Sequence, residues 1–154
     1  MTLANIHPTI SDDLPALRDV LDQTGLFPGD LLDDMVGPHL SGTTTDVWLT
    51  CYLDGAAVGF CYTVPEELTD GTWNMLALAV RPDVQGRQLG TALVRAAEEH
   101  LRRAHQRLLI VETSGTEAFA RTRAFYRQTG YQEEARIRDF WAKGDDKVIF
   151  RKAL

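Results

Sequence analysis

Residues 84–94, with the sequence VQGRQLGTALV, place two glycines and two long polar side chains directly before an apolar stretch with helical spacing. Glycine costs conformational entropy on folding, so this loop indicates a backbone that something approaches closely. Free N–H groups at the start of a helix, with the positive end of its dipole, make an anion-binding site. Gly86 and Gly90 would admit a pyrophosphate to the main chain. A tight strand-to-helix turn without a ligand explains the glycines equally well when the loop is considered alone.

Other chemistries that use glycine-rich loops or metal ions find less support. No Gly-Lys-Ser/Thr sequence follows the loop, so it is not a Walker A motif, and the glycine spacing does not match the Rossmann fingerprint. The histidines, at positions 7, 39, 100 and 105, show no metal-binding spacing, and we therefore expect no metal.

The two cysteines, Cys51 and Cys61, lie on the two arms of a predicted hairpin with Asp54-Gly55 at its turn. A two-residue turn there pairs Cys51 with Val58 and Trp48 with Cys61. The cysteines then do not face each other, so we expect no disulfide.

The chain has 154 residues, which is most simply one domain spanning 1–154 with enough length for a hydrophobic core. Its formal net charge of -6 argues against a nucleic-acid-binding protein, which usually carries a basic face. No window is long and apolar enough to cross a membrane, and the first residues lack the basic start and apolar run of a secretory signal. We therefore expect a cytoplasmic protein without nucleic-acid or membrane partners.

Changes of hydrophobic period predict a mixed α/β order: a strand, two helices, three strands, a helix, a strand, a helix and two strands. The first helix is expected to have Ser11 as its N-cap and to end at Gly25. A helix at 88–105 is expected to carry two pairs on its outer face, Glu98 with Arg102 and Glu99 with Arg103. The remaining elements are predicted at 2–9, 28–36, 47–53, 56–64, 72–80, 107–113, 116–130, 131–141 and 147–154.

Two motifs in the right order resemble the GNAT superfamily of acyl-CoA-dependent N-acetyltransferases. The first, V-x-P-x-x-Q-G-x-G-x-G between a strand and a helix, is similar to VRPDVQGRQLG at 80–90, where Gln88 replaces the middle glycine. The second lies on a later helix and is matched by Ala124, Phe125, Tyr126, Gly130 and Tyr131. The resemblance extends to the order of elements over nearly the whole chain.

The resemblance implies an α/β (α+β) single domain, in which a mixed, mostly antiparallel sheet with splayed central strands is flanked by helices. The strand at 74–80 is expected to diverge from that at 108–113, so that the pantetheine arm of acetyl-CoA binds the free edge at Leu78, Ala79 and Val80. An ordinary buried strand is the alternative for these three residues. The residues expected to hold the pyrophosphate are Gln85, Gly86, Arg87, Gln88, Leu89, Gly90 and Thr91.

The implied reaction transfers an acetyl group from acetyl-CoA to a primary amine by direct attack in a ternary complex. Tyr126 corresponds to the family's acid: its ordinary pKa of about 10 keeps it protonated, so it can donate to the leaving thiolate and contact the coenzyme. A core tyrosine is the alternative. Glu112 is the candidate base, although an exposed glutamate at a strand end explains it as well. Asn74, Thr113 or Ser114 could instead hold a water that takes the proton.

The acceptor is expected over the first two helices and the late hairpin. His39 is a weaker candidate there, and the acids at 30, 33, 34, 66 and 67 could attract an amine or else belong to solvated helix faces. Arg121 or Arg123 could replace an asparagine that the family often uses to bind the coenzyme. Residues that could line the acceptor pocket, or else belong to the core, are Phe27, Trp73, Phe140 and Trp141.

The sequence therefore predicts a small-molecule N-acetyltransferase, and it is compatible with a homodimer. Two alternatives stay open, a protein or peptide N-acetyltransferase and a non-catalytic acyl-CoA-binding module. The acceptor amine itself is not identified by the sequence.

Overall fold

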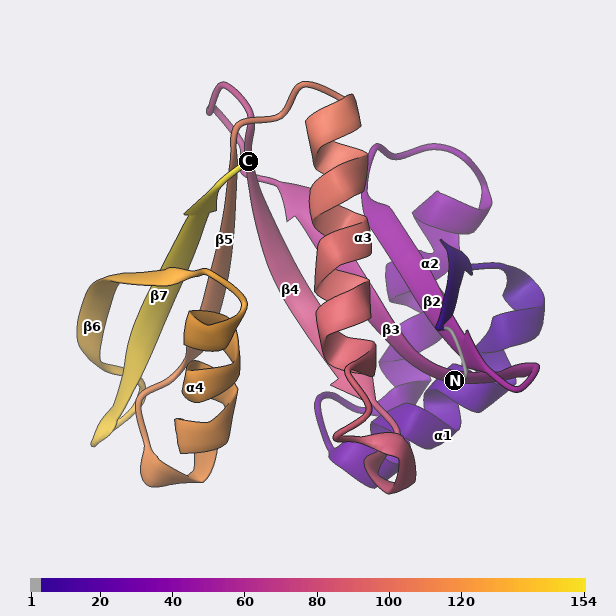
Figure 1. Cartoon of the computed structure of the whole chain (residues 1–154), viewed down its shortest axis with the longest axis horizontal. Coiled ribbons are helices and arrows are strands. Elements are labelled where there is room, and N and C mark those ends of the chain that lie inside the picture. Colours follow the sequence, from indigo (N-terminus) through magenta and orange to yellow (C-terminus); the bar gives the residue numbers. More distant parts are fainter. Residues whose placement is uncertain (1–3) are drawn as a thin grey trace.

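The computed structural model describes residues 4–154, which form one mixed sheet between two layers of helices (Figure 1). Within these residues the sheet has seven strands in the order β1-β2-β3-β4-β5-β7-β6. Neighbouring strands are antiparallel except for β4 and β5, which are parallel. The strands are β1 (Asn5–Pro8), β2 (Val47–Leu53), β3 (Ala56–Pro65), β4 (Thr72–Val80), β5 (Leu108–Ser114), β6 (Gln132–Ala142) and β7 (Asp145–Ala153).

Each face of the sheet has its own hydrophobic core. The helices α1 (Leu14–Thr24) and α2 (Leu32–Leu40) pack with Trp48 and Phe60 on one face. The helices α3 (Leu89–Arg103) and α4 (Ala120–Gln128) contribute to the core of the other face. Among residues 4–154, no helix combines the length and the apolar character needed to cross a bilayer.

Most predicted elements are confirmed, with ends shifted by a few residues; β4 has the predicted bounds. The predicted first strand is observed at Asn5–Pro8, and positions 2 and 3 lie outside the described residues. The predicted N-cap role of Ser11 is wrong: Asp13 Oδ2 instead accepts a hydrogen bond from the backbone N–H of Ile10, at 3.0 Å. The second helix also continues to Leu40, through residues that the sequence placed in a loop.

The predicted pairing of the β2–β3 hairpin is wrong by one residue. Cys51 pairs with Gly59 and Trp48 pairs with Tyr62, because a β-bulge at Val58 shifts the register beyond the turn. The two cysteines still do not face each other, and both are free and buried, as expected.

Of the two pairs predicted on the outer face of α3, Glu99–Arg103 is confirmed, at 2.9 Å. The predicted exposure of Glu98 is wrong: Arg102 lies 3.7 Å from its carboxylate, but Glu98 is completely buried. Its carboxylate accepts hydrogen bonds from the Tyr131 hydroxyl at 2.8 Å and from Lys152 Nζ at 3.1 Å, and Arg95 lies at 3.1 Å. Lys152 Nζ and Arg95 Nη1 also donate to the carbonyl of Thr129, which follows α4. Burial and the neighbouring Glu98 raise the pKa of Tyr131, which stays a proton donor. This network joins α3, on the β2–β4 half of the sheet, to β7 and the end of α4.

We expect Lys152→Met to lower the free energy of unfolding by about 1–3 kcal/mol, because it removes a hydrogen-bonded cation from a buried carboxylate. Arg95 and Tyr131 remain as partners, which limits the loss. The measurement is urea unfolding at pH 7. Lys143→Met is the matched control, since Lys143 is exposed and forms no ion pair within residues 4–154. Equal stability of the two variants would show that the Glu98 network is not needed to hold the halves together.

Candidate active site

The central strands β4 and β5 are paired only at their beginnings. Their register runs from Thr72 opposite Leu108 to Asn74 opposite Ile110, and the strands then diverge (Figure 1). Beyond Asn74 the edge of β4 that faces β5 therefore has no sheet partner. The predicted splay is thus confirmed, and an extended ligand with amide groups can pair with this edge as an added strand would.

A β-bulge in β4 lies next to this point of divergence. Met75 pairs with Thr63 and Ala77 with Tyr62, so that Leu76 has no partner on β3. Leu76 is 52% exposed although β4 is a central strand. A bulge bends the strand and turns its backbone groups away from the regular ladder. The sequence did not indicate Leu76, because a bulge leaves no distinct pattern in a short apolar strand.

The loop after β4 has a glycine-type backbone at two positions. Gly86 has φ +81°, and Gln88, at the N-cap of α3, has φ +66°. Such a conformation is strained for a residue with a Cβ, which explains why the GNAT motif usually has glycine where this chain has Gln88. Gln85 stabilises the loop from within: its backbone N–H donates to Pro82 and its side-chain amide to the Val80 carbonyl, at 2.8 Å.

The backbone N–H groups of residues 86–91 form a row of free donors. None of them donates a hydrogen bond within residues 4–154. The neighbouring Arg87 is exposed and forms no ion pair in the same part of the chain. Free donors at the N-terminus of α3, next to a guanidinium, fit a diphosphate.

Gly90 has space for a side chain, so the fold does not require a glycine there. Its φ is outside the left-handed region, and a Cβ would lie 3.5 Å from the Phe125 ring, an ordinary van der Waals contact. A tight turn alone therefore explains Gly86 but does not explain Gly90.

Tyr126 lies on α4 and is 4% exposed. Its ring packs against Phe125, Tyr131 and Phe150, with centroid distances of 5.1–5.8 Å. Burial first, and the nearby Cys61 second, raise the pKa of Tyr126. Cys61 is the β3 partner of Leu78, and Tyr126 and Leu78 pack in the same core cluster. Within the described chain its hydroxyl has no hydrogen-bond partner, although the same side chain is also part of the core.

Glu112 lies on β5 beyond the last paired residue, beside the splay. Its Oε2 lies 2.8 Å from Lys147 Nζ, and its Oε1 accepts a hydrogen bond from Asn74 Nδ2 at 3.4 Å. Asn74 Nδ2 also donates to Glu66 Oε1, at 2.9 Å. We call these four residues the Asn74 cluster. The sequence indicated Glu112, Asn74 and Glu66 separately, the last only as one of several acids that could attract an amine. It gave no role to Lys147, whose strand was read only as part of the sheet.

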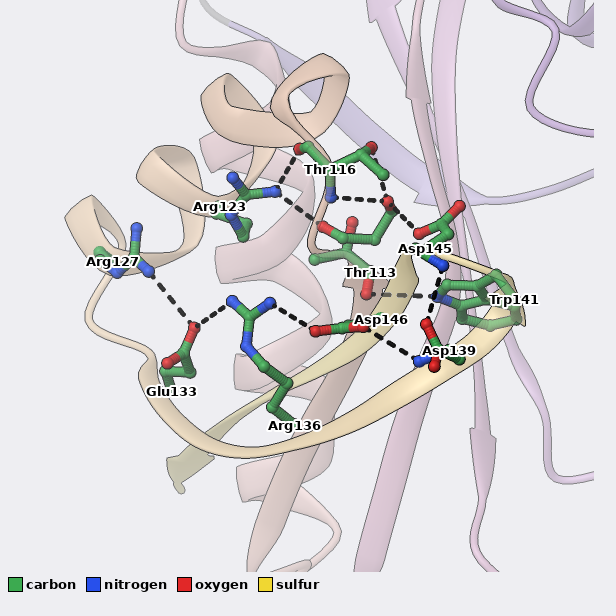
Figure 2. Close-up of polar contacts among 12 residues, drawn as sticks. Thr113, Thr116, Arg123, Arg127, Glu133, Arg136, Asp139, Trp141, Asp145 and Asp146 are labelled. Carbon is green, nitrogen blue, oxygen red and sulfur yellow. Dashed lines mark hydrogen bonds and ion pairs between the residues drawn. The ribbon is translucent and has the colours of Figure 1, made fainter.

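An irregular segment of β6 lies next to Lys147. Between the pairs Ile137–Lys147 and Ala142–Asp145, residues 138–141 of β6 face only Asp146. Figure 2 shows how Asp146 holds this segment: its carboxylate accepts from the backbone N–H of Asp139 at 3.0 Å and from Arg136 at 3.1 Å. These two contacts lower the pKa of Asp146, the backbone N–H contributing most.

The aromatic rings of this segment lie at the edge of the Asn74 cluster. Phe140 and Trp141 form an edge-to-face pair and are 46% and 49% exposed. Lys147 Nζ lies 4.2 Å from the centre of the Phe140 ring, and Trp141 donates to the carbonyl of Thr113. Both rings therefore lie beside Lys147, and their contact with the acceptor stays a prediction.

Other sequence candidates lie away from this cluster. Trp73 is buried and donates to Gln106, and Phe27 packs on Phe60 of the other core. His39 contacts the carbonyl of Thr9, at 2.9 Å. The guanidinium of Arg123 is occupied by the carbonyls of Ser114 and Thr116, which fixes the start of α4 against the end of β5 (Figure 2).

Two surface hollows lie away from the splay, and no cluster of metal-ligating side chains is found in residues 4–154. Within residues 4–154, no group of three or more metal-ligating side chains comes together. Two surface hollows of about 610 and 590 Å³ lie along the β1 edge, around His7 and Tyr52 and around Pro8 and His100.

Comparison with known proteins identifies the class. Residues 44–133 match the acetyltransferase (GNAT) domain family. A solved structure from Desulfovibrio desulfuricans, assigned to the GNAT family, is 30% identical, with 98% of this chain and 99% of that chain covered and a TM-score of 0.88. The protein therefore belongs to the GNAT family and is an acetyltransferase. No curated protein sequence matches it significantly.

More distant structures share the fold. The ribosomal-protein-S18-alanine N-acetyltransferase of Escherichia coli is 20% identical, covers 98% of this chain and 94% of its own, and has a TM-score of 0.79. An aminoglycoside 6'-N-acetyltransferase solved with coenzyme A is 16% identical, with 97% and 96% covered and a TM-score of 0.80. These two proteins act on different kinds of acceptor, and the fold alone does not choose between them.

Proposed function

We propose that the protein transfers the acetyl group of acetyl-CoA to the primary amine of a small molecule, in a ternary complex. The observation that carries the proposal is the divergence of β4 from β5, which ends beside the row of free N–H groups at 86–91. The N–H groups of Gly86 to Thr91, with Arg87, hold the diphosphate, and Gln85 fixes the loop. Leu78, Ala79 and Val80 offer their free backbone edge to the pantetheine amides.

Tyr126 is the acid of this reaction. The amine nitrogen forms a bond to the thioester carbon, the C–S bond breaks, and the phenol gives its proton to the leaving sulfur. The raised pKa keeps the phenol protonated at the pH where the thiolate leaves. An acceptor that binds as an ammonium ion loses one proton to water before it attacks as the free amine. After the attack the nitrogen releases a second proton on the side of the splay where Glu112 lies, and this proton restores the phenol through water.

A small-molecule acceptor is supported by the groups around Glu112. Lys147 lies beside its carboxylate, and the rings of Phe140 and Trp141 lie beside Lys147. A protein or peptide amine is the alternative acceptor, in view of the ribosomal-protein acetyltransferase that shares the fold. The two buried, free cysteines fit a reducing, cytoplasmic environment.

An amine panel tests the proposed function. Purified protein is given acetyl-CoA with alkylamines, arylalkylamines, an aminoglycoside or a peptide with a free N-terminal alanine, and released thiol is measured. We expect turnover of at least one small amine with kcat/KM about tenfold above the peptide. A preferred peptide would support the alternative acceptor. Tight acetyl-CoA binding without turnover of any amine would support the non-catalytic module.

Gly90→Ala tests whether the loop holds the diphosphate. We expect the variant to be as stable as the wild type or up to about 1 kcal/mol more stable, because Ala favours a helix and fits beside Phe125. Its Kd for CoA, measured by calorimetry, should rise at least about tenfold, since the Cβ obstructs the approach to the main chain. Unchanged affinity in a folded variant would mean that Gly90 has no part in the site.

Tyr126→Phe tests the acid. We expect kcat to fall by about 100-fold or more while the KM for acetyl-CoA changes little. Tyr131→Phe is the matched control, because its ring packs against Tyr126 while its hydroxyl contacts Glu98. That control should lose about 1–3 kcal/mol of stability and keep its kcat. If both variants lose kcat equally, the effect comes from packing, and the acid is another group.

A further inference from the structure

The side chain of Asn74 carries an unsatisfied acceptor at the closed end of the splay. Asn74 is 3% exposed, and its Nδ2 donates to both Glu66 and Glu112. Its Oδ1 is buried and accepts no hydrogen bond within residues 4–154. A buried oxygen without a donor is unfavourable, so a donor from outside the chain is expected to satisfy it.

The two carboxylates beside Asn74 differ in their partners. Glu112 has a donor on each oxygen, with Lys147 Nζ at 2.8 Å and Asn74 Nδ2 at 3.4 Å. Glu66 has only the Asn74 amide and forms no ion pair within the described chain. The Asn74 cluster thus contains two anionic groups and one cation, so one negative charge is left uncompensated. The uncompensated charge is that of Glu66, which contacts the Asn74 amide. The Oδ1 that lacks a donor belongs to the same amide.

Two hydrogen bonds fix the backbone of Glu66. Its N–H donates to the carbonyl of Thr72 at 2.8 Å, and its carbonyl accepts from the Thr69 hydroxyl at 2.8 Å. These contacts close the turn between β3 and β4. The carboxylate is therefore held against β4, near the last residue that pairs with β5.

We propose that Glu66 and Asn74 bind the ammonium group of the acceptor. Asn74 Oδ1 accepts one N–H of the ammonium, the Glu66 carboxylate neutralises its charge, and Glu112 is a positioning residue that Lys147 keeps in place. The proposal rests on the proposed function and adds the class of acceptor. This class is a monoamine in its ammonium form, joined to an apolar or aromatic group that packs on Phe140 and Trp141.

Lys147 is the reason for expecting a single amine. It is 13% exposed and lies between the Glu112 carboxylate and the Phe140 ring. A second ammonium on the body of the acceptor would approach this cation in a region partly removed from water, where like charges repel most strongly. An apolar body meets no such repulsion.

Binding of 2-phenylethylamine tests the subsite without relying on turnover. The protein is saturated with CoA, and the Kd of the amine is measured by calorimetry for the wild type, Glu66→Gln and Glu67→Gln. Glu67 is the matched control, because it is adjacent and exposed. We expect Glu66→Gln to raise the Kd at least tenfold and Glu67→Gln to leave it within twofold. A wild-type protein that does not bind the amine, or equal Kd values for the two variants, would overturn the proposal.

Two further comparisons separate this subsite from the proposed function. 1,8-Diaminooctane should bind at least tenfold more weakly than octylamine, and equal binding would remove the monoamine class. CoA affinity and turnover are then measured with the same variants. If the wild type acetylates amines and Glu66→Gln has an unchanged KM for them, the subsite is wrong while the acetyltransferase function stands. If the wild type binds 2-phenylethylamine through Glu66 but acetylates no amine, the subsite stands while the proposed function is wrong.

Discussion

The short parallel pairing of β4 and β5 is the constraint on which the rest of the structure depends. The two strands share hydrogen-bonded register only over Thr72–Asn74, and every later backbone group on the facing edge of β4 is left without a strand partner. Backbone groups on such an edge lack partners until water or a ligand supplies them. The bulge at Leu76 lies on the β4 side of the opening, and α4, which carries Tyr126, lies on the side of β5 and β7 (Figure 1).

A sheet that opens in the middle needs another connection between its halves. The Glu98 network provides one, because the carboxylate belongs to α3 while Lys152 belongs to β7 and Tyr131 follows α4. Its groups are buried and hydrogen-bonded, which makes their geometry demanding and therefore rigid. The separation of β4 from β5 is thus compatible with a single folded body. The polar contacts of Arg123 with the end of β5 place α4, and with it Tyr126, relative to the opening.

Local patterns in the sequence predicted the parts of the site that depend on local structure. The run from β4 through the glycine loop to α3 was recognisable because the turn and the helix start constrain residue types directly. The conformation of Gln88 could not be predicted with the same ease, since glutamine rarely adopts φ +66° and only the family motif points to that backbone. The register of β2 and β3 was predicted from the geometry of the turn alone. The bulge at Val58 shifts the observed register by one residue from that prediction.

The contacts between distant strands were beyond the sequence. Glu98 reads as an exposed helix residue because its partners, Tyr131 and Lys152, lie more than thirty positions away. In the same way, the Asn74 cluster combines residues of the β3–β4 turn, β4, β5 and β7, and none of their spacings carries a motif. Residue types indicated Glu112 and Asn74 individually, but only the fold shows that they share one amide contact.

The most direct test of the account is a titration of the ¹⁵N-labelled protein with CoA, followed by the backbone amide resonances. We expect the largest shifts for Gly86 to Thr91 and a second group on β4 at Leu76 to Val80, with little change on β1 and β2. Saturable binding that leaves these two groups unchanged, or shifts centred on the hollows near His7 and His100, would contradict the assignment of the opening between β4 and β5 as the acetyl-CoA site.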